Sequence, residues 1–462
     1  MLREKGLSAA LILTGMRSEG MPMNETIAAI STAPGTGAVS MIRISGPDAF
    51  AIASSLSGQD FSNIPGYTIR HGDVRENGKI VDEVLYSFYR APKSYTGENV
   101  VEISCHGGVY ITRKVLSLVF GAGAKPARRG EFTERAYLNG KMDLSEAEGI
   151  NDLINARDSV NAVSAVHSMK GSVKRILDPL VESLTQILAQ IEVNIDYPEY
   201  EDVEQLRDEE ILPKAEKWLE QINQLIDTAE KAVMIRSGID TVILGRPNVG
   251  KSSLLNALLE EDKAIVTEVA GTTRDLVEGS VRVGNVTLNL IDTAGIHESS
   301  DRIEQMGIER SLKALKEADL VILVLDSSQG ITEEDRKLME LVKDQEYIQV
   351  YNKADLNQIP GTVSISAKNH EIQPLIEEIE KRFAEGIAAA GSDTLNNERQ
   401  IGLAIQAEEV MSAAISELKE GAEPDLVTID LQKAWESLKE ITGEAGRENF
   451  LDEIFSRFCL GK

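Results

Sequence analysis

Cysteine is scarce: the 462-residue chain has two, Cys105 and Cys459. Two cysteines cannot form the disulfide framework of a small secreted domain, and neither lies in a CxxC motif or a Cys/His cluster with zinc-binding spacing. The sequence therefore predicts neither a disulfide scaffold nor a zinc centre of that kind. Such cysteine use is typical of the reducing cytoplasm, where we expect this chain to reside.

Long hydrophobic runs are also missing. A membrane-spanning helix needs roughly 18 or more consecutive apolar residues, and the longest runs here, residues 320–325 and 288–291, have strand length. Near the N-terminus, Arg3 and Lys5 precede an apolar run at residues 9–13 that is too short for a secretory signal. We expect no membrane span, and we expect residues 1–22 to be a disordered extension or to lie upstream of the native start.

Positive charge is in short supply, because 48 Lys and Arg face 75 Asp and Glu, for a net charge of −27. The mean field of such a chain repels phosphate polymers, so nucleic-acid binding would need a local basic patch. One candidate patch is Arg113, Lys114, Lys125, Arg128, Arg129, Arg135 and Lys141, interrupted only by Glu131 and Glu134. A solvated surface and a binding surface both fit this pattern.

The chain has about three times the length of a typical domain, and its apolar fraction of 42% is that of a globular protein. Short β-like segments separated by glycines predict a small α+β domain near the N-terminus, with strands at residues 27–30, 39–44, 80–88 and 100–103. From Leu144 the apolar spacing becomes helical. We expect Asp178 to cap a helix with Pro179 in its first turn, and the following apolar residues to share one face.

Between residues 239 and 384, strand-length apolar runs alternate with helical stretches, which predicts a parallel sheet covered by helices. Residues 385–396 have the composition of a linker, and helical spacing then resumes. The predicted fold is therefore multidomain. It comprises an α+β domain at 23–141, an all-α helical domain in two parts at 142–237 and 385–462, and an inserted α/β domain at 238–384.

Residues 245–252 have the pattern Gly-x-x-x-x-Gly-Lys-Ser, between a predicted strand at 241–244 and a predicted helix at 253–259. This is a phosphate-binding P-loop in its strand–loop–helix context. Backbone N–H groups of such a loop, with the positive end of the following helix, surround phosphate oxygens. We therefore expect Lys251 to contact the β- and γ-phosphates and the Ser252 hydroxyl to bind Mg²⁺.

Further GTPase motifs follow the P-loop in order. Gly271-Thr272-Thr273 predicts a switch loop with Thr273 on the Mg²⁺, and Asp292-Thr293-Ala294-Gly295 predicts a carboxylate near the metal and a glycine N–H near the γ-phosphate. Asn352-Lys353-Ala354-Asp355 and Ser366-Ala367-Lys368 end two more predicted strands. Asp355 can accept hydrogen bonds from N1–H and the exocyclic amine of guanine, which adenine cannot offer. The predicted nucleotide is GTP, and the inserted domain is a P-loop GTPase domain.

The residue that orients the attacking water is less obvious. Ile296 occupies the position that often holds a glutamine, and its side chain accepts no hydrogen bond. Glu304 is a candidate from its place in the sequence. On its own, such a glutamate is more often an exposed helix carboxylate.

Six further signatures, one of which extends the Gly271-Thr272-Thr273 motif, lie at residues 33–37, 95–98, 106–108, 129–136, 271–275 and 458–462. On these residues the chain resembles, over about residues 24–462, the MnmE family of tRNA-modification GTPases, also called the TrmE family. The resemblance implies a homodimer whose chains each have a folate-binding domain, a discontinuous helical domain and an inserted GTPase domain. It also implies a FAD-dependent partner of the MnmG (GidA) type in a heterotetramer. Together they add an aminomethyl or carboxymethylaminomethyl group to C5 of the wobble uridine of certain tRNAs.

The resemblance implies that a reduced folate, 5,10-methylene- or 5-formyl-tetrahydrofolate, is bound by Arg43, Glu102, Lys141 and Lys462. Guanidinium and ammonium groups suit the folate glutamate, and a carboxylate suits the amino edge of the pterin. Lys141 also belongs to the basic patch, which would then serve folate, tRNA or both.

The resemblance also implies that K⁺ stimulates GTP hydrolysis when two GTPase domains dimerise, supplying the positive charge of an arginine finger. The implied K⁺ ligands are Asn248, Thr267, Val269 and Thr272, and Glu304 matches the water-orienting glutamate of the family. The complete predicted GTP site adds neighbours of the motifs, and its residues are Asn248, Val249, Gly250, Lys251, Ser252, Ser253, Thr267, Glu268, Val269, Ala270, Gly271, Thr272, Thr273, Asp292, Thr293, Ala294, Gly295, Asn352, Lys353, Ala354, Asp355, Ser366, Ala367 and Lys368.

A regulatory GTPase that assembles ribosomes, with flanking domains that only bind RNA, shares every motif of the GTPase domain and is the alternative function. Folate binding separates the two classes. A modification enzyme is expected to bind a reduced folate through residues 23–141, whereas an assembly factor is not.

Overall fold

The computed structural model describes residues 25–156, 158–196, 211–261, 277–291, 315–423, 426–445 and Gly461. The chain forms two compact units: residues 1–147 with 446–462, and residues 148–445. The predicted N-terminal extension at 1–22 lies outside the described residues. No helix in the described ranges is both long and apolar enough to cross a membrane.

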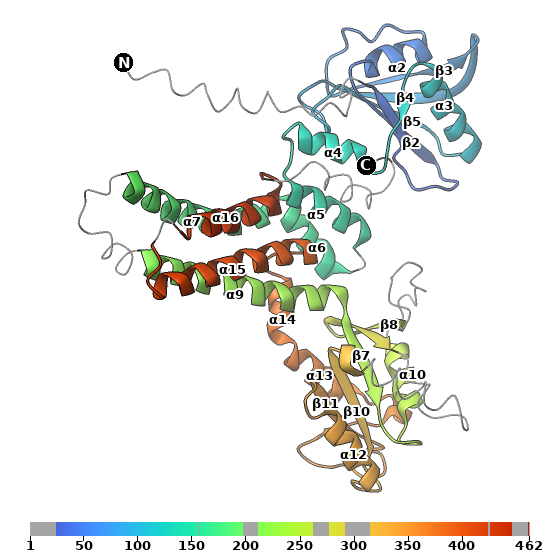
Figure 1. The fold of residues 1–462 in the computed structure, drawn as a ribbon. Helices are drawn as coiled ribbons and strands as arrows, with labels where there is room; N and C mark the ends of the chain where they lie inside the picture. Colours follow the sequence, from blue (N-terminus) through green and yellow to red (C-terminus); the bar gives the residue numbers. More distant parts are fainter. Residues whose placement is uncertain are drawn as a thin grey trace, which may run out of the picture. The chain divides into compact units, whose positions relative to one another are not determined.

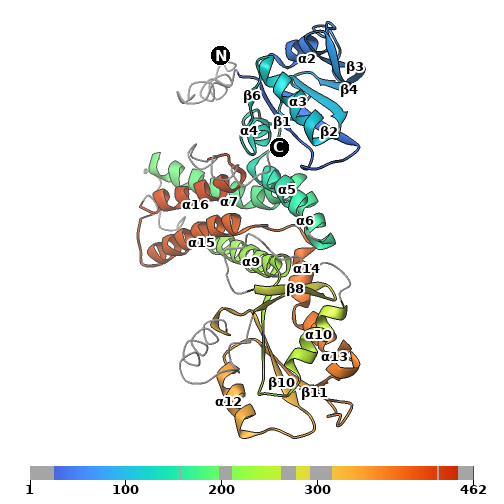
Figure 2. The same cartoon turned by 90° about the vertical axis from the view of Figure 1, so that its right-hand side faces the viewer.

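The first unit contains a six-stranded sheet with the order β3-β4-β5-β2-β1-β6 (Figures 1 and 2). Its strands are β1 (Ile27–Ile30), β2 (Val39–Ser45), β3 (Thr68–Glu76), β4 (Lys79–Tyr89), β5 (Val100–His106) and β6 (Lys125–Pro126). Neighbouring strands are antiparallel except for the β1–β6 pair. This confirms the predicted α+β domain and its four predicted strands.

The two faces of this sheet have different covers. Helices α2 (Ala49–Ser57) and α3 (Val109–Gly121) pack on the face that carries Ile42 and Ile44. On the opposite face, Phe132 of the short helix α4 (Glu131–Leu138) packs against Ile27 and Ala29 of β1. Because side chains alternate between the faces of a strand, Arg43 of β2 points to the face that α4 covers in part.

The second unit begins with helices α5 (Leu144–Asn155, which starts in the first unit), α6 (Ser159–Met169), α7 (Ser172–Asp196) and α9 (Leu212–Ser237). It ends with α15 (Glu398–Lys419) and α16 (Thr428–Thr442). Helices α7, α9, α15 and α16 lie side by side and share one apolar core (Figure 1). Segments on both sides of the inserted domain thus build one helical domain, as the sequence predicts.

The predicted start of the helix near Asp178 was wrong. Helix α7 begins at Ser172, and Pro179 lies inside it. An interior proline removes a backbone donor, but Val173 and Leu177 are fully buried and extend the apolar stripe of Leu180 and Leu184 toward the N-terminus. Burial of these two side chains therefore offsets the cost of the proline.

The inserted domain is a six-stranded sheet with the order β12-β11-β10-β7-β9-β8, parallel except for β8. Its strands are β7 (Ile239–Leu244), β8 (Val277–Val283), β9 (Val286–Ile291), β10 (Leu320–Asp326), β11 (Tyr347–Asn352) and β12 (Val363–Ser364). Helix α12 (Glu333–Val342) lies on one face, and α10 (Lys251–Glu261) and α13 (Gln373–Arg382) lie on the other (Figure 2). The central strands β7 and β10 are buried along their whole length, as expected for a sheet covered on both faces.

The predicted linker at 385–396 was partly wrong, because Ala384–Ala390 forms helix α14. This helix packs on α9, and a Cβ atom on Gly386 would lie 2.9 Å from Cγ1 of Ile235. Alanines resemble a linker in composition but are the best helix formers. Helix α14 therefore joins the GTPase domain to the helical domain through packed contacts.

We expect Leu184→Ala to lower the free energy of unfolding by about 2–5 kcal/mol, because its fully buried side chain would leave a cavity. Leu426→Ala, at a side chain that is 64% exposed, is the matched control and should change it by less than about 0.5 kcal/mol. Urea unfolding followed by tryptophan fluorescence measures this, since Trp218 and Trp435 both lie in the helical domain. Equal effects of the two variants would contradict the packing described here.

Candidate functional site

The P-loop follows the carboxyl end of β7, and its shape depends on residues without a side chain. A Cβ atom on Gly245 would lie 2.5 Å from the carbonyl oxygen of Val324 on β10. Gly250 has φ +101°, and a Cβ atom there would lie 2.2 Å from Nδ2 of Asn352. Asn248 also has a left-handed conformation, with φ 63°. The loop therefore has the tight turn that brings backbone N–H groups around a phosphate.

Lys251 opens α10 and folds back over this loop. Its Nζ donates to the carbonyl oxygens of Gly245 at 2.6 Å and Arg246 at 3.1 Å. Burial lowers the pKa of Lys251 below its usual value. Ser252 and Ser253 follow in the first turn of α10 and are exposed, so the Ser252 hydroxyl is open to a metal ion.

Asn352 joins three motifs that lie far apart in the sequence. Its Nδ2 donates to the carbonyl oxygen of Val249 in the P-loop at 2.8 Å. Its Oδ1 accepts from the backbone N–H of Ala367 at 3.0 Å. The side chain is 3% exposed, so both hydrogen bonds are shielded from water. The structure thus brings together the P-loop, residues 352–355 and residues 366–368, as the sequence predicts.

Lys353 and Asp355, in the same motif as Asn352, are also held by hydrogen bonds. Ser366 Oγ donates to Oδ1 of Asp355 at 2.9 Å, which orients the carboxylate that we expect to bind guanine. Lys353 has φ 69°, and its Nζ donates to Oδ2 of Asp326 at 2.6 Å. Burial would raise the pKa of Asp326, but hydrogen bonds from Lys353 and Ser328 outweigh it and lower the pKa.

Asp326 was missed in the sequence analysis. It is the last residue of β10, 2% exposed, and the loop that it begins fastens the base-binding motif. Ser327 Oγ also donates to the carbonyl oxygen of Lys353 at 3.0 Å. The available signal was an acidic residue directly after six apolar strand residues, at the same sheet edge as the other motifs.

Several predicted site residues lie outside the described residues. They are Thr267, Glu268, Val269, Ala270, Gly271, Thr272 and Thr273, then Asp292, Thr293, Ala294 and Gly295, and finally Glu304 and Lys462. The assignments of the switch loop, the K⁺ ligands other than Asn248, and the water-orienting glutamate therefore stay predictions.

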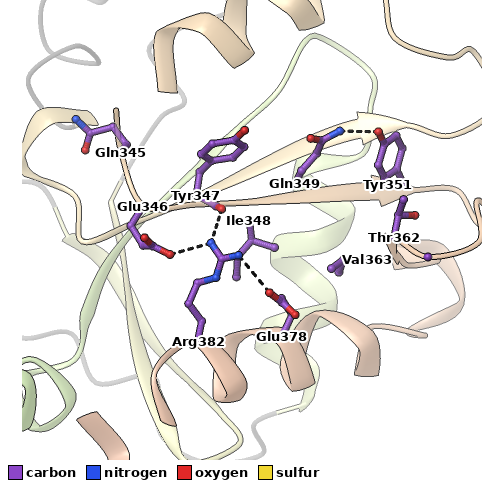
Figure 3. Close-up of a pocket in the computed structure, with 11 residues that line it drawn as sticks. Gln345, Glu346, Tyr347, Ile348, Gln349, Tyr351, Thr362, Val363, Glu378 and Arg382 are labelled. Atoms are coloured by element: carbon purple, nitrogen blue, oxygen red, sulfur yellow. Dashed lines mark hydrogen bonds and ion pairs between the residues drawn. The ribbon is translucent and has the colours of Figure 1, made fainter. Parts of the chain in front are cut away.

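The GTPase domain also has a pocket along strands β11 and β12 and helix α13 (Figure 3). Arg382 crosses it, donating to Oε1 of Glu346 at 2.8 Å, to the carbonyl oxygen of Tyr347 at 2.7 Å and to Oε1 of Glu378 at 3.2 Å. None of the predicted GTP-binding residues that the structure describes lines this pocket. The nucleotide site is therefore located by the P-loop and by residues 352–355 and 366–368, and not by this pocket.

In the first unit, Arg43 and Glu102 face each other across β2 and β5. Arg43 Nε donates to Oε1 of Glu102 at 2.9 Å, and its guanidinium lies over the rings of Tyr95 and Phe132, 5.1 and 5.6 Å from their centroids. The structure therefore brings together two of the four predicted folate residues, as an ion pair whose side chains are 14% and 13% exposed. Tyr95 was not singled out as a ligand in the sequence analysis.

Lys141 and the C-terminal tail contact nearby parts of the same unit. Lys141 Nζ donates to the carbonyl oxygen of Pro92 at 3.0 Å, and its aliphatic chain lies beside Gly97, in the loop that also carries Tyr95. In the tail, the carbonyl oxygen of Gly461 accepts from Ser31 Oγ at 3.0 Å. A Cβ atom on Gly461 would lie 2.2 Å from the carbonyl oxygen of Ile30, so only glycine fits there.

The predicted basic patch is not a continuous cationic surface. Arg135 is buried and bonds to Glu98 and Glu131, at 3.2 and 2.9 Å. Arg128 pairs with Glu134 at 2.9 Å, and Lys114 pairs with Glu76 at 2.7 Å. Glutamates therefore neutralise three of the seven basic residues. Arg113, Lys125, Arg129 and Lys141 are exposed.

Comparisons with known proteins match both the N-terminal region and the rest of the chain. Residues 144–459 match the MnmE helical domain, and residues 26–141 match the N-terminus of the GTP-binding protein TrmE. The chain is 45% identical to the tRNA modification GTPase MnmE of Pediococcus pentosaceus, covering 95% of this chain and 98% of that protein. The MnmE of Lactococcus lactis subsp. cremoris gives the same three values. The chain belongs to the MnmE family.

Two solved structures match about a third of this MnmE family member. The G domain of the T. maritima FeoB iron transporter is 29% identical, with a TM-score of 0.24 over 32% of this chain and 98% of that chain. Aquifex aeolicus Era is 25% identical, with a TM-score of 0.25 over 38% of this chain and 67% of that chain.

We expect Gly250→Ala to weaken GTP binding by about tenfold or more, because a left-handed φ costs a residue with a Cβ roughly 1–3 kcal/mol. The new methyl group would also collide with Asn352. Gly279→Ala, in β8 with open space around its Cα, is the matched control. Titration with a fluorescent GTP analogue measures the affinity of both variants. Unchanged binding by Gly250→Ala would refute the described packing of the P-loop against Asn352.

Proposed function

We propose that the chain couples K⁺-stimulated GTP hydrolysis to the modification of wobble uridine in tRNA, with a one-carbon unit from a reduced folate. Membership of the MnmE family makes it a GTP hydrolase that acts in tRNA modification. The identity of 45% over 95% of the chain carries this conclusion. The product would be an aminomethyl or carboxymethylaminomethyl group on C5 of uridine 34.

Nucleotide chemistry in this proposal uses residues of the GTPase domain. Lys251 would exchange the two loop carbonyl groups for the β- and γ-phosphates, and Ser252 with Thr273 would bind Mg²⁺. Asn248, which is exposed in the P-loop, would supply its side chain as a K⁺ ligand. A K⁺ ion there would stabilise the negative charge that develops during phosphoryl transfer. Glu304 would hold the attacking water.

The folate proposal depends on the half-covered face of the N-terminal sheet. Ile69, Ser87, Glu102, Arg43 and Ala29 are successive cross-strand partners, so their side chains lie in one row on one face. Helix α4 covers the β1 end of this row, whereas Ile69 is 60% exposed at the β3 end. Charged and apolar groups in one row suit a ligand with a flat ring and a carboxylate tail.

The same face supports the proposal of a homodimer. Three apolar side chains there are exposed: Tyr67, just before β3, by 70%, Ile69 in β3 by 60%, and Leu85 in β4 by 44%. Exposed apolar side chains that cluster on one face are typical of a protein interface. We further propose a FAD-dependent partner of the MnmG type, tRNA as the substrate, and the cytoplasm as the location.

We expect GTP turnover to be at least about tenfold faster in KCl than in NaCl at equal ionic strength, since one well-placed positive charge has a large effect on phosphoryl transfer. Asn248→Ala should remove this difference. Asn285→Ala, at an exposed asparagine of the β8–β9 turn, is the control and should keep it. Phosphate release measured under saturating GTP provides the rates. Equal wild-type rates in the two salts would refute the K⁺ site.

We expect Gly461→Ala to abolish wobble-uridine modification while leaving K⁺-stimulated GTPase activity nearly intact. The added methyl group would push the tail, and with it Lys462, away from β1. Removal of residues 459–462 should have the same two effects. Gly121→Ala, at a glycine of α3 with open space around it, is the control.

Mass spectrometry of wobble nucleosides from cells that express only the variant measures modification, and circular dichroism checks the fold. Modification at the wild-type level in the truncated chain would exclude the tail from the folate site. Loss of both activities together, with a lower melting temperature, would show that the tail is only structural.

A further inference from the structure

The P-loop carries a buried ion pair that the GTPase motifs do not explain. Nε of Arg246, the second residue of the loop, lies 3.4 Å from Oδ1 of Asp335 in α12. The two side chains are 14% and 0% exposed. Within the described residues, neither of these two atoms has a hydrogen bond. The attraction between opposite charges in a dry environment is therefore their main interaction.

A second contact ties Arg246 to the loop after β10. Nη2 of Arg246 donates to Oε1 of Gln329 at 3.0 Å. Gln329 belongs to the same loop as Asp326, which binds Lys353 of the guanine motif. Arg246 thus connects the start of the phosphate loop to the loop after β10 and to helix α12.

Asp335 is itself fixed in place. Its other oxygen, Oδ2, accepts from the backbone N–H of Thr332 at 2.9 Å and from Thr332 Oγ1 at 2.7 Å. The backbone N–H of Asp335 in turn donates to Thr332 Oγ1 at 3.3 Å, which completes the capping box of α12. One carboxylate oxygen therefore anchors the aspartate to its own helix, and the other faces the arginine. Such an arrangement gives Arg246 a rigid partner.

The loop that Arg246 begins is held in a conformation that an isolated chain would rarely adopt. Asn248 has φ 63° and Gly250 has φ 101°, and Pro247 restricts the backbone of Arg246. The carbonyl oxygen of Arg246 also accepts from Lys251. A tether on this residue would keep the loop in its phosphate-binding shape when thermal motion would otherwise open it.

We propose that Arg246 is a positioning residue for nucleotide binding: through Asp335 and Gln329 it holds the P-loop in the conformation that receives the phosphates. It acts on the loop and does not touch the γ-phosphate. The proposal concerns the GTPase reaction alone and does not depend on K⁺, folate or a partner protein. It predicts an effect on the affinity for GTP and GDP alike, because both nucleotides fill the same phosphate cradle.

The test is a double-mutant cycle with Arg246→Gln, Asp335→Asn and the double variant. Asparagine keeps an oxygen for the capping box of α12 but loses the charge that attracts Arg246. Arg336→Gln, at an arginine that is 67% exposed on the next residue of the same helix, is the matched control. Affinities for GDP and a non-hydrolysable GTP analogue, kcat at saturating GTP, and melting temperature are measured for each.

We expect each single variant to weaken GDP and GTP-analogue binding by a similar factor of about ten, as when the competent loop is populated one-tenth of the time. The value of kcat should change by less than about twofold, because the lost interaction is equal in the ground and transition states. The double variant should bind no more weakly than the weaker single variant, since both changes break one tether. Arg246→Lys, which keeps the charge, should restore part of the affinity.

Three results would overturn the proposal. Weaker binding of the GTP analogue alone, with a large fall in kcat, would show that Arg246 contacts the γ-phosphate as an arginine finger in the same chain. Additive effects in the double variant would show that Arg246 and Asp335 act separately. Wild-type affinities in Arg246→Gln would show that the tether has no role. If Asp335→Asn melts at a lower temperature, Gln329→Ala replaces it in the cycle, because it removes the tether from an exposed loop.

Discussion

The buried amide of Asn352 is the contact on which the nucleotide site depends. One side-chain group donates to the P-loop and the other accepts from the segment at 366–368, so a single residue sets the distance between phosphate and base recognition. A parallel sheet makes this possible because the carboxyl ends of its strands meet at one edge. An amide suits this position because its NH2 group donates while its separate carbonyl oxygen accepts, so one side chain reaches partners on two sides. Gly250 must lack a side chain for the same reason, because Asn352 occupies the space.

A different constraint organises the first unit. Ser31, near its N-terminal strand, bonds to Gly461, 430 residues later in the sequence. The whole helical and GTPase region is therefore inserted between two segments that pack on each other. Gly461 approaches β1 this closely because it lacks a Cβ atom. The candidate folate residue Arg43 lies opposite Ala29, the neighbour of the Ile30 that the tail contacts.

Sequence reasoning succeeded where one residue pattern permits one local structure. The P-loop and residues 352–355 each end a strand, and apolar runs bounded by glycines predicted β1, β2, β4 and β5. It failed where tertiary packing decides. Pro179 was taken as a helix start because the buried Val173 and Leu177 cannot be recognised without their neighbours. The linker that became α14 depends on contact with Ile235, and the roles of Asp326 and Asp335 depend on strand order.

The seven-residue basic patch shows the same limitation for charge. Counting along the sequence gave an excess of positive charge, but Arg135 is buried among Glu98 and Glu131, and Arg128 and Lys114 have glutamate partners. Buried arginine needs such partners because an unpaired charge away from water is costly. The net charge of −27 produces an average electrostatic field that repels the phosphates of tRNA. The exposed cations at Arg113, Lys125, Arg129 and Lys141 are then the part of this region that is open to phosphates, while Arg135 holds α4 in place through Glu98.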